Sequence, residues 1–129
     1  MPVQKAEKAV ENSSLSSIYK GTYDLLLRIS IATKDFPREH KHTLGQRLRD
    51  EVLELIVFIY RANSIADRAA HITSIIERIQ VVEVMIRLAH DLRVLPRNHY
   101  IGLVEMTDSL ARQAHGWLKS SGRRKPEQV

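Results

Sequence analysis

The chain has no cysteine, and this absence excludes several kinds of chemistry. Without thiols it has no disulfide, no thiolate nucleophile and no thiolate metal site. Glycine and proline are scarce, at 5 and 4 of 129 residues, which disfavours folds rich in strands and turns. No apolar run approaches the roughly 18 residues of a membrane span, and the first residues lack the apolar core of a secretory signal. We therefore expect a cytoplasmic protein without a membrane partner.

Motifs of catalysis and base recognition are also missing. Aromatic residues make up only 5% of the chain, which disfavours a stacking platform for single strands. The sequence holds no glycine-rich phosphate loop, no zinc finger and no paired RNP aromatics. No nucleophile, base and orienting group occur in a recognisable pattern. These observations predict a non-enzymatic protein that needs no cofactor.

Six histidines raise the question of a metal site. A metal centre inside a helical bundle needs inward carboxylates and a Glu-x-x-His motif on its helices. That spacing occurs only from Glu39 to His42, in a predicted connector. Ser64, Asp67 and His71 lie near a predicted helix start, where serine and aspartate are better explained as caps. We expect no metal site.

Four segments repeat apolar residues at spacings of three and four, the pattern of amphipathic helices. They span about 15–34, 43–62, 65–92 and 96–120. Pro37 disfavours helical backbone at the residue before it and should end the first helix. Thr43-Leu44-Gly45-Gln46 is a capping box that should begin the second. Long helices with short connectors predict an all-α, antiparallel up-down-up-down four-helix bundle.

The predicted bundle covers residues 15–120. Residues 1–14 are polar and without periodicity, so we expect a flexible N-terminal segment. Residues 121–129 are basic and poor in apolar side chains, so we expect a disordered tail. The second helix is apolar over more than half its circumference, Val57 and Phe58 included. Such a helix is either central in the bundle or faces a second subunit.

The formal net charge is +5, and it is unevenly distributed. Residues 28–49 carry a net +4, as do residues 112–129, whereas residues 50–111 carry −3. An up-down bundle places its first and third connectors at one end, and such a basic end suits a phosphate backbone. Solvated helix ends with a favourable dipole explain the same charges without a ligand. The predicted nucleic-acid-binding residues are Arg38, Lys41, Arg47, Arg49, Arg93, Arg97, Lys119, Arg123, Arg124 and Lys125.

Short motifs in a fixed order suggest a family. They are Phe36-Pro37-Arg38, Thr43-Leu44-Gly45-Gln46-Arg47, Leu53-Glu54-Leu55, Arg87-Leu88-Ala89-His90-Asp91-Leu92 and Gly116-Trp117-Leu118-Lys119. Over about residues 19–120 the chain resembles the four-helix-bundle proteins related to Avd, the accessory variability determinant of diversity-generating retroelements. Relatives include proteins encoded in intervening sequences of bacterial ribosomal RNA genes. His90 stands where the family pattern has lysine.

The resemblance implies a homopentameric barrel with a basic surface. For Avd itself it implies binding to nucleic acid and to a reverse transcriptase. Arg38 and Arg47 match motif positions, and Lys41 and Arg49 lie beside them. The leading hypothesis is therefore a non-enzymatic, oligomeric accessory protein that binds RNA or DNA with weak sequence specificity, with a reverse transcriptase as a candidate protein partner. The alternative is a structural or protein-interaction bundle.

Overall fold

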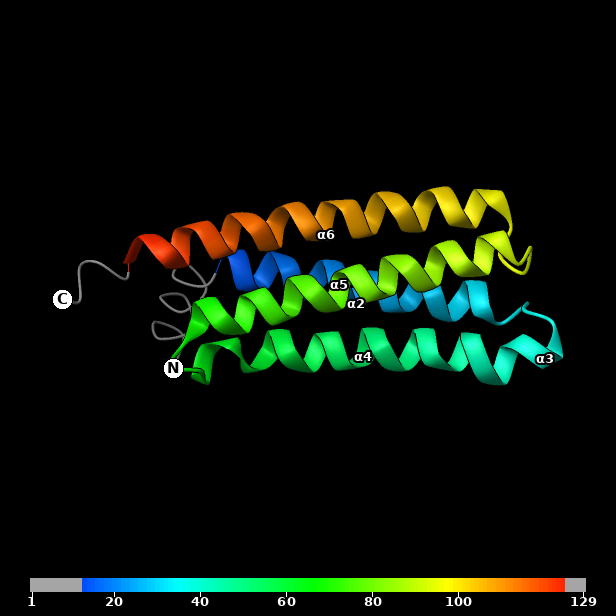
Figure 1. The fold of residues 1–129 in the computed structure, drawn as a ribbon, viewed down its shortest axis with the longest axis horizontal. Helices are drawn as coiled ribbons and strands as arrows, with labels where there is room; N and C mark the ends of the chain where they lie inside the picture. The colour runs from blue at the N-terminus through cyan, green and yellow to red at the C-terminus, as the bar shows by residue number, and fades with distance from the viewer. Residues whose placement is uncertain (1–12, 125–129) are drawn as a thin grey trace, which may run out of the picture.

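Four long helices build the fold, as the apolar spacing predicts. The computed structural model describes residues 13–124. Its long helices are α2 (Ser13–Thr33), α4 (Gln46–Arg61), α5 (Arg68–Asp91) and α6 (Arg97–Arg124), and this part of the chain contains no strand. Consecutive helices run in opposite directions (Figure 1). The all-α, up-down-up-down four-helix bundle is confirmed.

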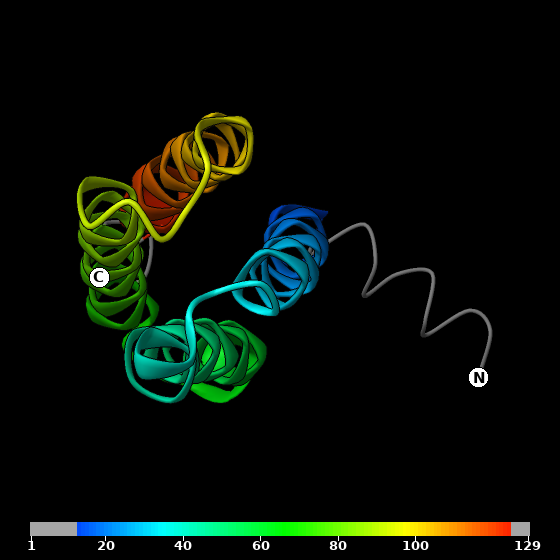
Figure 2. The same ribbon diagram turned by 90° about the vertical axis from the view of Figure 1, so that its right-hand side faces the viewer.

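Each long helix packs against two others and lies diagonal to the fourth. α2 packs on α4 and α6, and α5 packs on the same two helices. Viewed along the bundle, α2 and α5 occupy opposite corners (Figure 2). Two connectors lie at one end of the bundle, between α2 and α4 and between α5 and α6 (Figure 1). The start of α2, the end of α6 and the connector between α4 and α5 lie at the other end.

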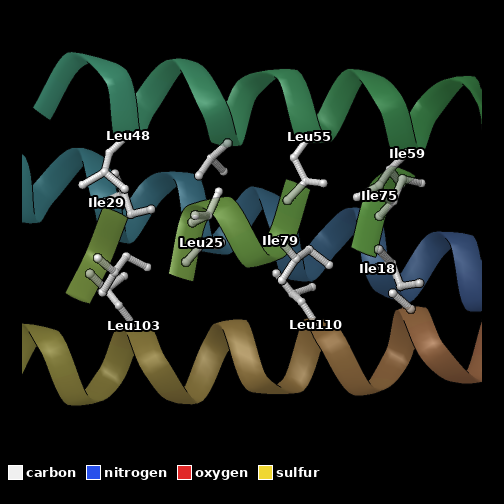
Figure 3. Close-up of a cluster of buried hydrophobic side chains, with 14 of the residues drawn as sticks. Ile18, Leu25, Ile29, Leu48, Leu55, Ile59, Ile75, Ile79, Leu103 and Leu110 are labelled. Carbon is white, nitrogen blue, oxygen red and sulfur yellow. The ribbon is translucent and has the colours of Figure 1, made fainter. Parts of the chain in front are cut away.

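One apolar stripe from every helix fills the centre. Side chains from all four helices converge between them (Figure 3). Trp117 is also buried in this core, while Leu27 and Ile31, which the sequence pattern adds to the first stripe, are about half exposed. The largest fully buried side chains are Ile18, Leu25, Ile29, Leu48, Leu55, Ile59, Ile72, Ile75, Ile79, Ile86, Leu103 and Leu110.

The second helical stretch begins earlier than the capping box predicts. Backbone turns α3 (Arg38–His40) and η1 (Lys41–Gly45) precede α4 without a break. The carbonyl of Pro37 accepts from the amides of His40 and Lys41, both at 2.9 Å. Proline lacks an N–H, so it loses nothing by standing just before a helix. The predicted connector 38–42 is therefore helical.

The capping box itself does not form. The Thr43 hydroxyl donates backward to the carbonyl of Glu39 at 3.0 Å, and the Gln46 side chain donates forward to Asp50 Oδ1. Because the helix already runs through Thr43, no free amide remains there for a cap to satisfy. Thr43 lies within the π-helical turn η1, which is wider than an α-helical turn.

The ends of the bundle differ slightly from the prediction. α2 starts at Ser13 rather than near residue 15, a difference within the usual uncertainty of helix boundaries. α6 continues to Arg124, so residues 121–124 are helical and not part of a disordered tail. No proline interrupts this stretch, and basic residues at a carboxyl end favour the helix dipole. The predictions for residues 1–12 and 125–129 lie outside the described residues.

A residue in left-handed backbone closes α5. Arg93 has φ 61°, the only positive φ of a non-glycine residue in the described range. The amide of Val94 donates to the carbonyl of Ala89 at 3.0 Å, and the amide of Arg93 donates to His90 at 2.9 Å. These bonds form a Schellman motif, whose left-handed position usually holds glycine. Arginine there carries a steric cost of about 1 kcal/mol.

We expect Arg93→Gly to stabilise the fold, because glycine adopts this backbone without strain. The free energy of unfolding in urea should rise by about 0.5–1 kcal/mol after the entropic cost of glycine is included. Arg93→Ala keeps the strained geometry and serves as the control without a gain. Equal stability of both variants would contradict the strain at this position.

Candidate nucleic-acid interface

The fold places six of the predicted binding residues at one end of the bundle. Arg38, Lys41, Arg47 and Arg49 belong to the turns and helix that follow α2, and Arg93 and Arg97 flank the connector from α5 to α6. Both connectors lie at the same end in Figure 1, and this end faces the viewer in Figure 2. We call residues 34–49 and 91–99 the basic end.

Most cations of the basic end reach solvent. Arg38, Arg47, Arg93 and Arg97 are exposed, and Lys41 is half-buried. Arg47 Nη2 lies 4.0 Å from Glu51 Oε1, and 70% of the Arg47 side chain is exposed. An exposed pair at that distance contributes little, so Arg47 can turn toward a ligand at small cost.

Arg49 has a different position from its neighbours. Its Nη1 donates to the Thr33 hydroxyl at 2.7 Å, and its Nη2 donates to Gln46 Oε1 at 2.9 Å. The first bond joins the start of α4 to the end of α2. Gly45 is buried beside this contact, and a Cβ added to it would stand 3.4 Å from side-chain atoms of Thr33 and Phe36. Arg49 therefore holds the corner together, a role that the sequence prediction of a ligand contact missed.

The remaining predicted residues lie at the opposite end. Lys119 is exposed near the end of α6. Arg123 and Arg124 are the last two residues of the same helix. Lys125 lies outside the described residues. The predicted set is thus divided between two ends, as the topology implies.

Two further cations border the basic end and were absent from the predicted set. Lys34 is exposed just beyond the last residue of α2. Arg28 is exposed on α2 and lies across α6, because a Cβ on Gly102 would stand only 2.7 Å from its Nη2. The sequence signal of this close approach was a glycine, Gly102, in the interior of a predicted helix.

Residues 16–121 match the family model described as bAvd-like. The match covers most of the chain. This protein belongs to the bAvd-like family. No curated protein matches its sequence.

The family motifs of this bAvd-like chain divide between core and surface. Trp117 packs in the core, and Lys119, two residues on, is exposed. His90 stacks on Tyr100, with ring centroids 4.0 Å apart and planes 8° apart. Its Nδ1 is buried and has no hydrogen-bond partner. The imidazole at this motif position packs between helices and does not extend into solvent as a lysine can.

Acidic groups lie along the middle of the bundle. Glu83 of α5 faces Asp108 of α6, and burial, together with the negative charge of Asp108, raises the pKa of the Glu83 carboxyl. Glu51 lies between α4 and α5, with its Oε2 3.8 Å from Arg78 Nη1. A polyanion is therefore repelled by this part of the surface and attracted by the ends.

Asp67 and His71 have structural roles. Asp67 caps α5 by accepting from the amide of Ala70 at 3.1 Å, as the sequence predicts. His71 Nε2 bonds to the carbonyl of Phe58 near the end of α4, where such carbonyls lack helical partners. The Phe58 ring lies between the imidazole of His71 and the guanidinium of Arg78, 4.2 Å from its centroid. Among the described residues no cluster of three metal-ligating side chains occurs.

Most of the exposed large apolar side chains lie in two separate stripes. The first, the α2/α4 stripe, is Tyr19, Tyr23, Leu27, Ile31, Leu53 and Tyr60. Tyr19 and Tyr60 bring the two helices together, with ring centroids 6.5 Å apart. The second, the α5 stripe, is Val81, Val84, Leu88 and Leu92. Val57 and Phe58, expected to widen the apolar face of the second helix, are half-buried. Within residues 13–124 no helix has the length and apolar character needed to cross a bilayer.

We expect Arg49→Met to destabilise the protein by about 1–2 kcal/mol, because it removes two hydrogen bonds made by a charged group. Arg47→Met, two residues away on the exposed side, should change stability by less than about 0.5 kcal/mol. Urea unfolding at one protein concentration measures both. If the two variants lose the same stability, Arg49 is not the tie between α2 and α4.

Proposed function

We propose that this bAvd-like protein is a non-enzymatic accessory protein that binds the phosphate backbone of nucleic acid. One observation carries the proposal: exposed arginines from two connectors, distant in sequence, lie at one end of the bundle, while acids occupy its middle. Lys and Arg at such a surface displace condensed counterions from the nucleic acid. The resemblance to Avd adds a reverse transcriptase as a candidate protein partner.

The chemistry of the basic end predicts weak sequence specificity. Arginine and lysine there can reach phosphates, and phosphate contacts carry no base information. Exposed tyrosines, which could stack on bases, lie on the α2/α4 stripe instead. Binding should therefore depend steeply on salt and little on sequence.

A triple charge reversal tests which surface binds. Arg38→Glu, Lys41→Glu and Arg97→Glu together should weaken binding to a single-stranded oligouridylate at least about tenfold at 0.1 M salt. They should also flatten the slope of log K against log salt by about 0.7 for each lost contact. Fluorescence polarisation with a rhodamine-labelled oligonucleotide measures both quantities.

The matched control reverses Lys20, Arg61 and Arg112, which are also exposed and give the same change in net charge. It should bind almost as well as the unchanged protein, and circular dichroism checks that both variants fold. A larger loss in this control would place the site away from the basic end. No binding by the unchanged protein at low ionic strength would refute nucleic-acid binding altogether.

We further propose that the protein forms a closed homo-oligomer, which the resemblance implies to be a pentamer. The two apolar stripes support this assembly. Val84 is 67% exposed and Tyr60 73% exposed, and α2 and α5 stand at opposite corners of the bundle (Figure 2). Two different patches on opposite sides, each complementary to the other, make a head-to-tail contact, which closes into a ring when the rotation allows it.

Light scattering should give a mass of about five times the 14.8 kDa chain. Leu88→Glu in the α5 stripe and Tyr60→Glu in the α2/α4 stripe should each prevent the ring from closing, because each places a charge in an apolar contact. Gln80→Glu, exposed on α5 outside the stripe, is the control that should leave the assembly intact.

Mixing the two stripe variants distinguishes the kind of contact. A head-to-tail interface leaves one intact pair of surfaces, so the mixture should form a dimer with one copy of each variant and nothing larger. An unchanged protein that is monomeric at micromolar concentration would contradict the assembly.

A further inference from the structure

The basic end holds three of the six histidines. His40 is the last residue of α3 and half-buried, His42 lies in η1 and is exposed, and His99 lies in the first turns of α6 and is half-buried. The other three lie elsewhere or are engaged. His71 bonds to a carbonyl, His90 stacks on Tyr100, and His115 lies toward the far end of α6.

We propose that these three imidazoles make the basic end a proton-linked anion site, which binds nucleic acid more tightly as the pH falls from 8 to 6. The inference rests on the proposed function, because it concerns the regulation of the same surface. Histidine is the side chain whose charge changes within this pH range. The site gains cations there without any change of fold.

The imidazoles stand among more cations than acids. Residues 34–49 and 91–99 hold seven lysines and arginines against three acids, a formal +4 that becomes +7 with three imidazolium groups. Glu39 Oε1 lies 3.9 Å from His40 Nε2. The adjoining elements carry these other charged or titratable groups: Lys34 and Asp35 after α2, Arg38 and Lys41 in α3 and η1, Arg47, Arg49 and Asp50 in α4, His90 and Asp91 in α5, and Arg93 and Arg97 close to His99 in the chain.

Cationic neighbours oppose the charging of an imidazole, and a bound polyanion reverses that opposition. Phosphates placed beside Arg38 and Arg97 neutralise the repulsion and attract the imidazolium groups. Proton binding and nucleic-acid binding therefore strengthen each other, and the coupling is reciprocal. At about 0.1 M salt each added cation that contacts a phosphate strengthens binding by about fivefold.

The test compares binding at pH 8 and pH 6 at one ionic strength. The probe is an oligouridylate with a pH-insensitive rhodamine dye, because neither uracil nor the phosphodiester titrates in this range. The unchanged protein should bind at least tenfold more tightly at pH 6, with a steeper dependence on salt. The triple variant His40→Gln, His42→Gln and His99→Gln should bind as the unchanged protein does at pH 8 and show little tightening at pH 6.

His115→Gln is the matched control, because it removes an exposed histidine distant from the basic end. It should retain the full pH dependence. Equal tightening in the triple variant and the unchanged protein would overturn the inference while leaving the proposed function intact. Absence of binding at both pH values would overturn the proposed function.

A second measurement needs no variant and covers the case in which the triple variant does not fold. Calorimetric titration with the oligouridylate at pH 6.5, in buffers of different ionisation enthalpy, reports the protons exchanged on binding. The proposal predicts uptake of protons by the complex. If the unchanged protein exchanges no protons on binding, or releases them, the proposal is contradicted.

Discussion

Burial of one apolar stripe from each of four helices is the constraint on which the rest of the structure depends. Each stripe must meet the others in a single core, and short connectors allow this only when successive helices reverse direction. Reversal brings the first and third connectors to the same end (Figure 1). Cations that are far apart in sequence thereby lie at the same end of the molecule, and of these only Arg49 takes part in the contacts between helices.

The corner after α2 shows how the core and the surface are joined. Phe36 is buried, and the helix restarts immediately after Pro37 instead of crossing a loose connector. Arg49 and Thr33 then tie α4 to α2. Backbone that is held in this way presents Arg38 and Arg47 on short, regular turns, so little backbone conformational entropy is lost when they meet a ligand.

The sequence was sufficient for the bundle, its order and the shared end, because helical periodicity reports burial directly. It was insufficient where two structures have the same local pattern. A serine- or threonine-led box predicts a helix start, but the earlier Pro37 already supplied one. Leu27 and Ile31 follow the spacing of core residues, yet they face outward, since spacing does not distinguish the core from an outer stripe. Arg49 looks like its neighbours in sequence, and only the contact with Thr33 separates it from them.

The central claim is that folding concentrates phosphate contacts at one end of the bundle. Photo-crosslinking with an oligonucleotide that contains 4-thiouridine, followed by mass spectrometry of the linked peptides, maps the bound surface without any substitution. We expect crosslinks within residues 34–49 and 91–99 and none along the acidic middle of α5 and α6. Crosslinks centred on residues 53–70 or on the α5 stripe would contradict it.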